Sequence, residues 1–343
     1  MNASNSKTVG VYTILFWGVV SLSMATYFYY TGSGINQICG HHDSLTQSGS
    51  STTAGTDIKV SHYKWAIFDR RDEKDSFTIV MLTYKRVKTL PPLLLTYCKT
   101  KYLAKIVVIW NDVGAKIPHN ILQVNNQCAV PIVFVKETKN YLTNRFKPRK
   151  EIETDCVCVI DDDRQLEDIQ DLEFAFRTWQ HFRMRIIGFE ERTYTYQKDG
   201  SFWYGVYPGT KIYPGYSMMG TGTTLFHRVY MEMYFDTNFV PEKVLDYINA
   251  RMNCEDIWFN IMVSKFLGDV SWKQPGALVV NPIKGIKNLA VKAYYIGGTK
   301  GLSARKTHYE ERTECLNNFA TFFNGTLPLH YTYTRIMHRV YPK

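Results

Sequence analysis

The chain has no long block of basic residues, although its formal net charge is +10 over 343 residues. Positive charge spread along a sequence in this way is typical of a solvated surface and argues against a nucleic-acid site. The chain shows no internal repeat, which excludes a repeat architecture. No group of His and Cys residues has zinc spacing, so we expect buried or bridged cysteines. Hydrophobic residues make up 45%, enough for a substantial core.

One segment lacks charge altogether, residues 9–30, which read VGVYTILFWGVVSLSMATYFYY. About 20 apolar residues span a bilayer core, and the aromatic residues at the end of the segment suit the membrane interface. Lys7 precedes the segment and the next basic residue is Lys59, so residues 1–8 are expected in the cytosol and the rest in the lumen. These features predict an uncleaved, single-pass type II anchor in the Golgi or endoplasmic reticulum membrane.

Residues 31–74 are poor in apolar side chains and rich in Gly, Ser and Thr, which predicts a flexible lumenal stem before a folded domain over residues 75–343. A lumenal location permits disulfides. The chain has seven cysteines, so at least one must be unpaired or bonded between chains. Asn324, in Asn-Gly-Thr, is a glycosylation sequon on the lumenal side.

The folded part begins with β-branched apolar runs that alternate with helical stretches. A helix with prolines near its start fits LPPLLLTYCKTKYL, between the first two runs. This alternation predicts an α/β fold around a mostly parallel sheet, whose ligands gather beyond the carboxyl ends of the strands. The four predicted strands are FTIVML (77–82), KIVVIW (105–110), PIVFV (131–135) and CVCVI (156–160).

Three aspartates, Asp161, Asp162 and Asp163, follow the fourth predicted strand without a break. A helix with apolar residues at helical spacing follows them behind a candidate cap, Asp168. The aspartates therefore lie in a turn at the ligand edge of the sheet. Adjacent like charges repel, so a cation is expected among them. Mg²⁺ or Mn²⁺ bridging to a diphosphate fits this pattern, and a solvated acidic turn is the alternative.

A second acidic pair, Glu255 and Asp256, opens a probable helix through Ile257, Ile261 and Phe266. Taken alone, the two acids indicate only a helix N-terminus stabilised by negative charge.

The sequence from about Asp75 to Pro328 resembles the exostosin-like proteins, glycosyltransferase family 64. It is most similar to the stand-alone, membrane-anchored members of that family. The order and spacing of the motifs carry the resemblance. They are SFTIVMLTYKR, VVIWNDVG, Asn140 and Asn144-Arg145, VIDDD, DLEFAFRTWQ, IIGFEER, YSMMGTGTTLF and NCEDIWFN.

The resemblance implies a GT-A fold, a UDP-sugar donor of the UDP-GlcNAc or UDP-GalNAc type, Mn²⁺, and retention of anomeric configuration. Asp163 matches the family's direct metal ligand, and Asp161 and Asp162 match positions that face the ribose and the sugar. The positions that match those holding the uridine or its phosphates are Arg86, Asn111, Asn140 and Arg145. Arg and Asn suit this work, because a guanidinium fork fits phosphate and an amide fits a base or ribose edge.

On the acceptor side, the resemblance makes Glu255 and Asp256 the acid/base candidates and pairs Cys254 with Cys315. It matches Arg305 to a mobile-loop arginine near the diphosphate, where a cation can stabilise the leaving UDP. The expected partners are the UDP-sugar, a saccharide acceptor and the membrane, with a homodimer left open.

Two departures from the family pattern keep a second hypothesis open. Leu82 stands where the family often has Gln, and Glu255 where it commonly has Asp. These changes support the alternative of a catalytically degenerate lumenal protein that binds sugar nucleotides or glycans, whereas the intact Asp161 to Asp163 and Arg305 speak against it. A metal-dependent phosphohydrolase fits the aspartates but not the motifs of the UDP site.

Overall fold

The computed structural model describes residues 62–67, 75–206, 215–269, 276–282, 285–289 and 301–337. The anchor expected at residues 9–30 and the cytosolic tail lie outside this part of the chain, as does most of the expected stem. Within the described residues, no helix is both long and apolar enough to cross a membrane.

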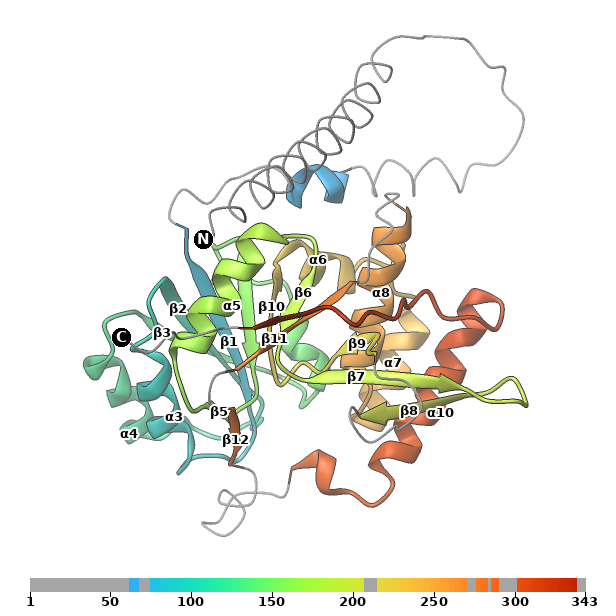
Figure 1. Ribbon diagram of the computed structural model, residues 1–343. Coiled ribbons are helices and arrows are strands. Elements are labelled where there is room, and N and C mark those ends of the chain that lie inside the picture. The colour runs from blue at the N-terminus through green and yellow to red at the C-terminus, as the bar shows by residue number, and fades with distance from the viewer. Residues whose placement is uncertain are drawn as a thin grey trace, which may run out of the picture. The chain divides into compact units, whose positions relative to one another are not determined.

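An eight-stranded sheet forms the centre of the fold, in the order β13-β11-β6-β10-β4-β1-β2-β3 (Figure 1). Neighbouring strands are parallel except around β10, which runs antiparallel to both β4 and β6. The strands are β1 (Phe77–Thr83), β2 (Leu103–Trp110), β3 (Ile132–Lys136), β4 (Cys156–Ile160), β6 (Ile186–Gly188), β10 (Thr223–His227), β11 (Ala277–Asn281) and β13 (Arg335–Met337). The prediction of an α/β fold with a mostly parallel sheet is confirmed.

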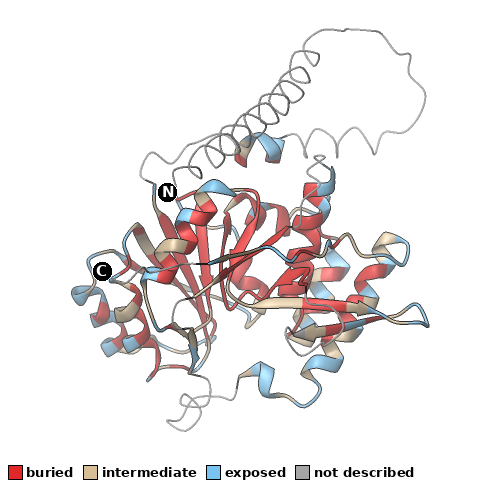
Figure 2. Ribbon diagram, viewed as in Figure 1, coloured by how far each residue is buried: buried red, intermediate tan, exposed pale blue. Residues whose placement is uncertain are grey.

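All four predicted strands form where the apolar runs lie, and β1 and β4 are buried over their whole length (Figure 2). Successive side chains of a strand point to opposite faces. Ile79 and Met81 therefore join one core, and Val80 and Leu82 join the other.

Helices cover both faces of the sheet, as parallel strands buried on both sides require. On one face pack α3 (Leu90–Tyr97), α4 (His119–Leu122) and α5 (Gln170–His181). On the other face pack α6 (Val229–Tyr234), α7 (Glu242–Arg251), α8 (Glu255–Asp269) and α10 (His308–Ala320). The prolines predicted near the start of the first helix occupy the first turn of α3.

Two small sheets flank the central one. β5 (Arg164–Leu166) pairs with β12 (Ile286–Asn288), and β9 (Met218–Met219) and β8 (Phe202–Val206) flank β7 (Glu191–Tyr196). Short 3₁₀ turns complete the fold, namely η1 (Gln123–Gln127), η2 (Leu142–Phe146), η3 (Leu302–Ala304) and η4 (Thr321–Phe323).

Residues 62–67, inside the segment expected to be a stem, form a short helix. Tyr63 and Ile67 are buried in the core that α8 also lines, and the Tyr63 hydroxyl donates to Asp236 Oδ2 at 3.1 Å. The contacts of the folded unit therefore begin before Asp75.

Two disulfides are present among the described residues, Cys98–Cys128 and Cys254–Cys315. The second confirms the pairing that the resemblance implied, and it ties the start of α8 to the middle of α10. Cys156 and Cys158 lie two residues apart on β4, so both point into the same core, where they are buried and take no part in either of these disulfides.

Candidate functional site

A cavity of about 460 Å³ opens at the carboxyl edge of the sheet. One wall comes from the segments after β1, β3 and β4, and the other from β7, β8 and the starts of α8 and α10. It takes in most of the predicted site residues, namely Arg86, Asn140, Arg145, Asp161, Asp162, Asp163, Glu255 and Asp256. Residues as far apart in the sequence as Arg86 and Asp256 therefore meet in one place.

The aspartate triplet is held by its neighbours in the fold. The backbone amide of Asp161 donates to the Gly222 carbonyl at 2.9 Å, in the turn before β10. The Thr83 hydroxyl, at the end of β1, donates to Asp162 Oδ2 at 2.8 Å. The triplet is thus fixed at the junction of β1, β4 and β10.

Arginines supply the positive charge that the triplet was expected to need. Arg145 Nη1 lies 2.8 Å from Asp161 Oδ1, and Arg86 Nη2 lies 3.1 Å from Asp163 Oδ2. Arg164 Nε is 3.9 Å from the other oxygen of Asp163. In the chain alone, these guanidinium groups relieve the repulsion among the carboxylates.

Burial nevertheless disfavours charge on part of the triplet. It raises the pKa of Asp162 to about 7, with the pull of Arg86 opposing and the charge of Asp163 adding to the shift. Burial and the neighbouring Asp161 also raise the pKa of Asp163. A further cation at this place would therefore favour the ionised form of the carboxylates.

Within the described residues, no three His, Cys, Asp or Glu side chains form a metal-binding group. Buried cationic atoms do remain available to an anion here. Arg86 is only 6% exposed and lines the cavity, yet its Nη1 has no hydrogen-bond partner in the protein. Arg145 Nε is likewise buried and unpartnered. Unsatisfied buried donors are costly, so these two atoms fit an anionic ligand.

Asn111 does not reach the cavity surface. It is fully buried at the end of β2, donates to Asn140 Oδ1 at 3.0 Å, and accepts from Asn144 Nδ2 at 2.9 Å. Its observed contacts hold the loop that presents Asn140 to the cavity.

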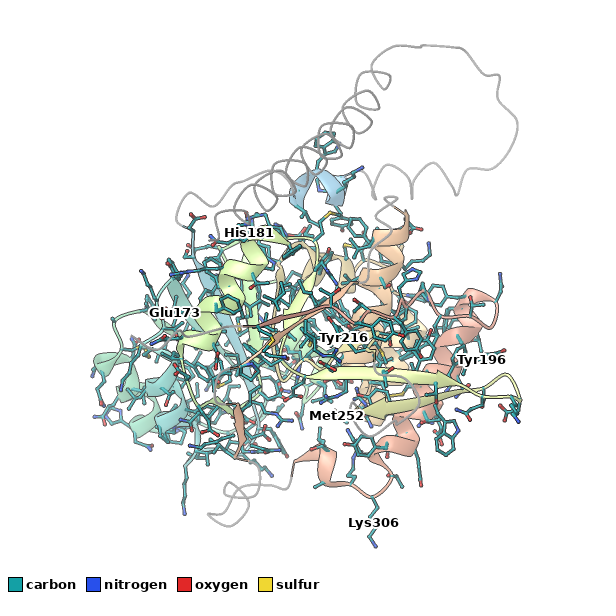
Figure 3. The ribbon with its side chains drawn as sticks, viewed as in Figure 1. Glu173, His181, Tyr196, Tyr216, Met252 and Lys306 are labelled. Carbon is teal, nitrogen blue, oxygen red and sulfur yellow. A yellow bond between two sulfur atoms is a disulfide. The ribbon has the colours of Figure 1, made fainter. Side chains whose placement is uncertain are left out.

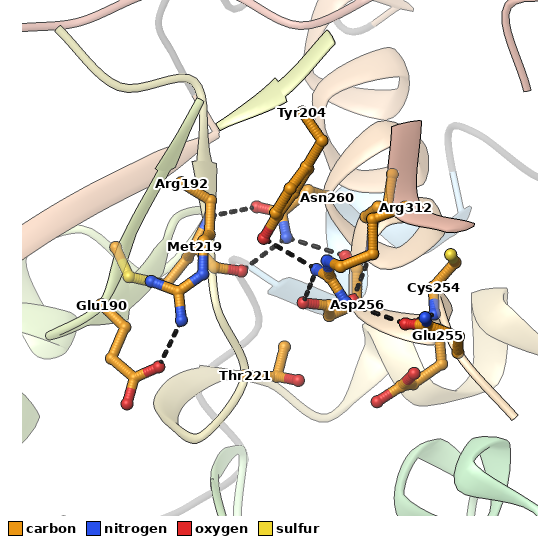
Figure 4. A network of polar contacts seen from close by, with 12 residues as sticks. Glu190, Arg192, Tyr204, Met219, Thr221, Cys254, Glu255, Asp256, Asn260 and Arg312 are labelled. Carbon is orange, nitrogen blue, oxygen red and sulfur yellow. Dashed lines mark hydrogen bonds and ion pairs between the residues drawn. The ribbon is translucent and has the colours of Figure 1, made fainter. Parts of the chain in front are cut away.

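On the opposite wall, α8 begins with Glu255 and Asp256, both buried. Figure 4 shows the two acids with Arg312 and Tyr204. Asp256 Oδ2 lies 2.5 Å from Nη2 of Arg312, a residue of α10. The same Arg312 nitrogen donates to the Tyr204 hydroxyl at 2.9 Å. The amide of Asn260 donates to the Met219 carbonyl at 2.8 Å and thereby ties α8 to β9.

The two acids of α8 have opposite pKa shifts. Burial raises the pKa of Glu255 to about 7, against the pull of Arg145, whose Nη1 is 3.7 Å away. Burial also opposes ionisation of Asp256, but the ion pair and hydrogen bond with Arg312 hold its pKa below the usual value. One carboxyl can therefore carry a proton near neutral pH while its neighbour stays charged.

Arg305, like Asn111, does not line the cavity. Its Nη2 donates to the Met252 carbonyl at 3.0 Å and lies 3.3 Å from Glu311 Oε2, so it braces the end of α7. Its neighbour Lys306 points outward at the edge of the molecule (Figure 3). Arg312, seven residues later, does line the cavity.

Sequence reasoning missed other cavity residues besides Arg312. In the sequence Arg312 looks like a surface charge among EERTEC, and only the neighbouring Cys315 hinted that this stretch lies beside α8. Glu190 and Arg192 were within the quoted motif IIGFEER but had no assigned role. The cavity residues that were missed are Arg164, Glu190, Arg192, Tyr204, His308, Tyr309 and Arg312.

Comparisons with known proteins agree with this geometry. The family described as the glycosyl transferase family 64 domain matches residues 77–341. The chain is 33% identical over 262 residues to Exostosin-like 2 of Mus musculus, with 75% of each chain covered. It is 33% identical over 257 residues to Exostosin-2 of Bos taurus, with 75% of this chain but 33% of that protein covered.

Among solved structures, a mannosyltransferase from Pyrobaculum calidifontis in complex with GDP-Man and Mn²⁺ matches with a TM-score of 0.40 and 13% identity. The match covers 67% of this chain and 64% of that one. The family match covers most of the chain, and the relatives confirm the resemblance read from the motifs. The chain belongs to glycosyltransferase family 64.

Proposed function

We propose that this glycosyltransferase is a Mn²⁺-dependent, retaining enzyme of the GT-A type. It moves an N-acetylhexosamine from a UDP-sugar to a glycan or glycolipid acceptor. One observation carries the proposal: a single cavity joins the aspartate and arginine cluster at the strand ends to the buried acids that open α8. The first group suits a nucleotide diphosphate and the second suits the transfer chemistry.

The nucleotide side of the cavity is made of Arg86, Asn140, Arg145 and the triplet Asp161–Asp163. The unpartnered Arg86 Nη1 and Arg145 Nε suit phosphate oxygens, because charge-assisted hydrogen bonds are the strong ones. Asn140 offers an amide to the base or ribose edge. Asn111 serves by holding Asn140 in place.

Asp163 is the residue that we expect to hold the Mn²⁺. A single protein carboxylate suffices, because such ions usually keep coordination positions for water and substrate phosphate. A site with one protein ligand would not form a group of three or more His, Cys, Asp or Glu side chains, and the described residues contain no such group. When bound, the ion would neutralise charge on the diphosphate.

On the transfer side, the bond from the sugar C1 to the phosphate oxygen breaks and UDP leaves with the electron pair. A bond from C1 to the acceptor oxygen forms on the same face, and the acceptor proton passes to the ionised carboxylate of Glu255. Asp256 orients the reacting sugar or hydroxyl, and Glu255 can exchange a proton near neutral pH. Arg312 holds Asp256 in place through their ion pair, and Arg86 and Arg145 offer the cations for the negative charge that develops on the leaving UDP.

We propose that the transfer takes place in the lumen. The apolar segment at residues 9–30 would anchor the protein in the membrane, with residues 1–8 in the cytosol and residues 31–74 as a lumenal stem. Asn324 is exposed just after η4, as a glycosylated residue must be. We therefore place the enzyme in the Golgi or endoplasmic reticulum as a type II membrane protein.

A donor screen tests the proposal. The purified protein is mixed with Mn²⁺ and a panel of nucleotide sugars, with and without saccharide acceptors, and UDP release is measured. We expect release from UDP-GlcNAc or UDP-GalNAc that depends on acceptor and is abolished by EDTA. Tight binding of UDP and Mn²⁺ without transfer from any donor would favour the degenerate binding protein instead.

A further inference from the structure

One lip of the cavity, formed by η3 and the first turn of α10 (residues 301–309), carries apolar side chains that the reaction described above does not use. Tyr309 is 53% exposed and Leu302 is 37% exposed, and both line the cavity. Among the described residues, no other large hydrophobic side chain that lines the cavity is so exposed. Exposed apolar side chains gathered at the mouth of a cavity mark a place that a ligand covers.

Tyr309 ends a row of side chains that starts at Asp256. Asp256 pairs with Arg312, which lies three residues after Tyr309 on α10. The guanidinium carbon of Arg312 is 4.4 Å from the ring centroid of Tyr204, and the ring centroid of Tyr309 is 6.3 Å from that of Tyr204. Figure 4 shows Asp256, Arg312 and Tyr204 together. The row therefore leads from a buried acid of the transfer side to an aromatic ring at the mouth of the cavity.

The lip differs from the interior of the cavity because no Lys, Arg, Asp or Glu of the lip lines it. The lip residues that do line the cavity are Gly301, Leu302, Ser303, His308 and Tyr309. Burial and the nearby Arg312 lower the pKa of His308 to about 4, so its ring is neutral at neutral pH. The basic residues of the same segment, Arg305 and Lys306, do not line the cavity.

A sugar ring fits such a surface. Its hydroxyl groups lie around the edge of the ring, and the C–H groups on one face form an apolar patch that packs on an aromatic ring. Tyr309 offers a large apolar area with a polar end, and neutral His308 can exchange hydrogen bonds with hydroxyl groups. A sugar on Tyr309 is not the sugar that reacts, because Arg312 and Tyr204 separate Tyr309 from Asp256.

We propose that Tyr309 binds the second sugar of the acceptor, the one to which the reacting sugar is attached. The inference rests on the proposed transfer to a saccharide and deepens it, because it makes the preferred acceptor a disaccharide or a longer chain. Tyr309 holds the acceptor by contact and takes no part in bond making.

Pairs of acceptors test the proposal. They are the methyl β-glycosides of glucose, galactose, glucuronic acid and N-acetylglucosamine, each alone and each β-linked to galactose. Methyl glycosides are used because an aromatic aglycone would itself pack on Tyr309. Transfer is measured with the full chain and the donor that the screen identifies, and kcat/KM is compared within each pair that reacts. We expect the wild type to prefer the disaccharide by about tenfold, the size of one good aromatic contact.

Tyr309→Ala should bring the disaccharide to within about threefold of the monosaccharide, with most of the change in the KM of the disaccharide. Tyr309→Phe should keep the wild-type ratio, because the ring remains and only the hydroxyl is lost. Tyr196→Ala is the matched control. Tyr196 is 64% exposed, lies at the edge of the molecule in Figure 3 and does not line the cavity, so its acceptor ratio should stay that of the wild type.

Equal use of both members of every reacting pair by the wild type would overturn the proposal, as would a Tyr309→Ala ratio unchanged from the wild type. If the wild type transfers to no acceptor, the proposed function fails instead. Binding of the same pairs in the presence of UDP and Mn²⁺, followed by NMR, then still decides the point. Disaccharide binding that Tyr309→Ala weakens by at least about fivefold would uphold the role of Tyr309. Equal binding by the two proteins, or no binding of any disaccharide, would refute it.

Discussion

Individual carboxylates in the cavity differ in their surroundings. Asp163 faces Arg86 and Arg164, Asp162 is held by the hydroxyl of Thr83, and Glu255 has only a distant guanidinium at 3.7 Å. These surroundings predict different roles for the carboxylates. The roles of Asp163 and Glu255 can each be tested by a single isosteric substitution.

Asp163→Asn should lower the affinity for UDP in the presence of Mn²⁺ by at least about tenfold. Asp163 is the direct ligand that we expect the protein to give the metal ion, and the substitution removes it. The fold should persist, because the amide keeps the size of the side chain and removes a charge from a repelling cluster. Calorimetric titration of UDP with Mn²⁺, repeated with EDTA, measures the effect. UDP affinity that responds neither to the substitution nor to EDTA would show that no metal binds here.

Glu255→Gln should change how stability depends on pH. The folded protein holds the Glu255 proton up to about pH 7, whereas the unfolded chain releases it near 4.5. The stability that this proton contributes is fully present below the unfolded pKa and is lost as pH rises through the folded pKa. The Tm of the variant, measured relative to wild type, should therefore increase from about pH 5 to about pH 8.

Asp256→Asn is the control for this measurement. Because the pKa of Asp256 is held low, its carboxylate is ionised in both the folded and unfolded protein over this range. The Tm difference between this variant and wild type should change with pH only through the Asp256 charge that helps to raise the pKa of Glu255, and therefore less than the difference for Glu255→Gln. A flat difference for Glu255→Gln would show that Glu255 titrates normally in the folded protein.

Arg312 shows what residue-level reading of the sequence could not supply. Its side chain is buried only because α10 packs on α8 and β8, and its partners Asp256 and Tyr204 lie 56 and 108 positions away in the sequence. Local sequence carries no signal for such long-range burial. The aspartate triplet could be placed, because its position follows directly from an apolar strand run.

At the scale of elements, the four strands with continuous apolar runs were predictable, since parallel strands buried on both faces have that composition. β6 and β13 have only three residues each, which is too short for a periodic pattern. β10 was also missed. Its antiparallel direction is set by its pairing with β4 and β6, which no local pattern reports.

The disulfide between Cys254 and Cys315 joins α8 to the helix that carries Arg312. Replacing both cysteines by alanine should cost about 2–4 kcal/mol of unfolding free energy, the usual range for a native disulfide. It should also lower kcat more than it weakens UDP binding, because the nucleotide side lies on other elements. Urea unfolding and steady-state kinetics measure the two effects.

The matched control replaces Cys98 and Cys128, whose disulfide lies on the face of the sheet that α3 covers. This change should reduce stability by a similar amount and leave kcat nearly unchanged. Equal kinetic losses from the two double variants would mean that the position of α10 does not matter for transfer.

At the scale of the whole molecule, we propose that one cavity has two sides with separate work: the strand ends bind the nucleotide, and the α8 side performs the transfer. The family explains why both sides are present, and the structure shows that they meet. The sequence alone could not show this meeting, because it depends on how α8 and α10 pack against the sheet.

Asp256→Asn tests the division most directly. The amide keeps the size of the side chain and can still accept a hydrogen bond from Arg312, so retained UDP and Mn²⁺ affinity serves as the check on folding. With saturating donor, kcat should fall about 10²–10⁴-fold, the usual worth of an acid/base or positioning group, while the Kd for UDP with Mn²⁺ stays within about twofold of wild type. Transfer at near the wild-type rate, or a loss of UDP binding as large as the loss of kcat, would contradict the account.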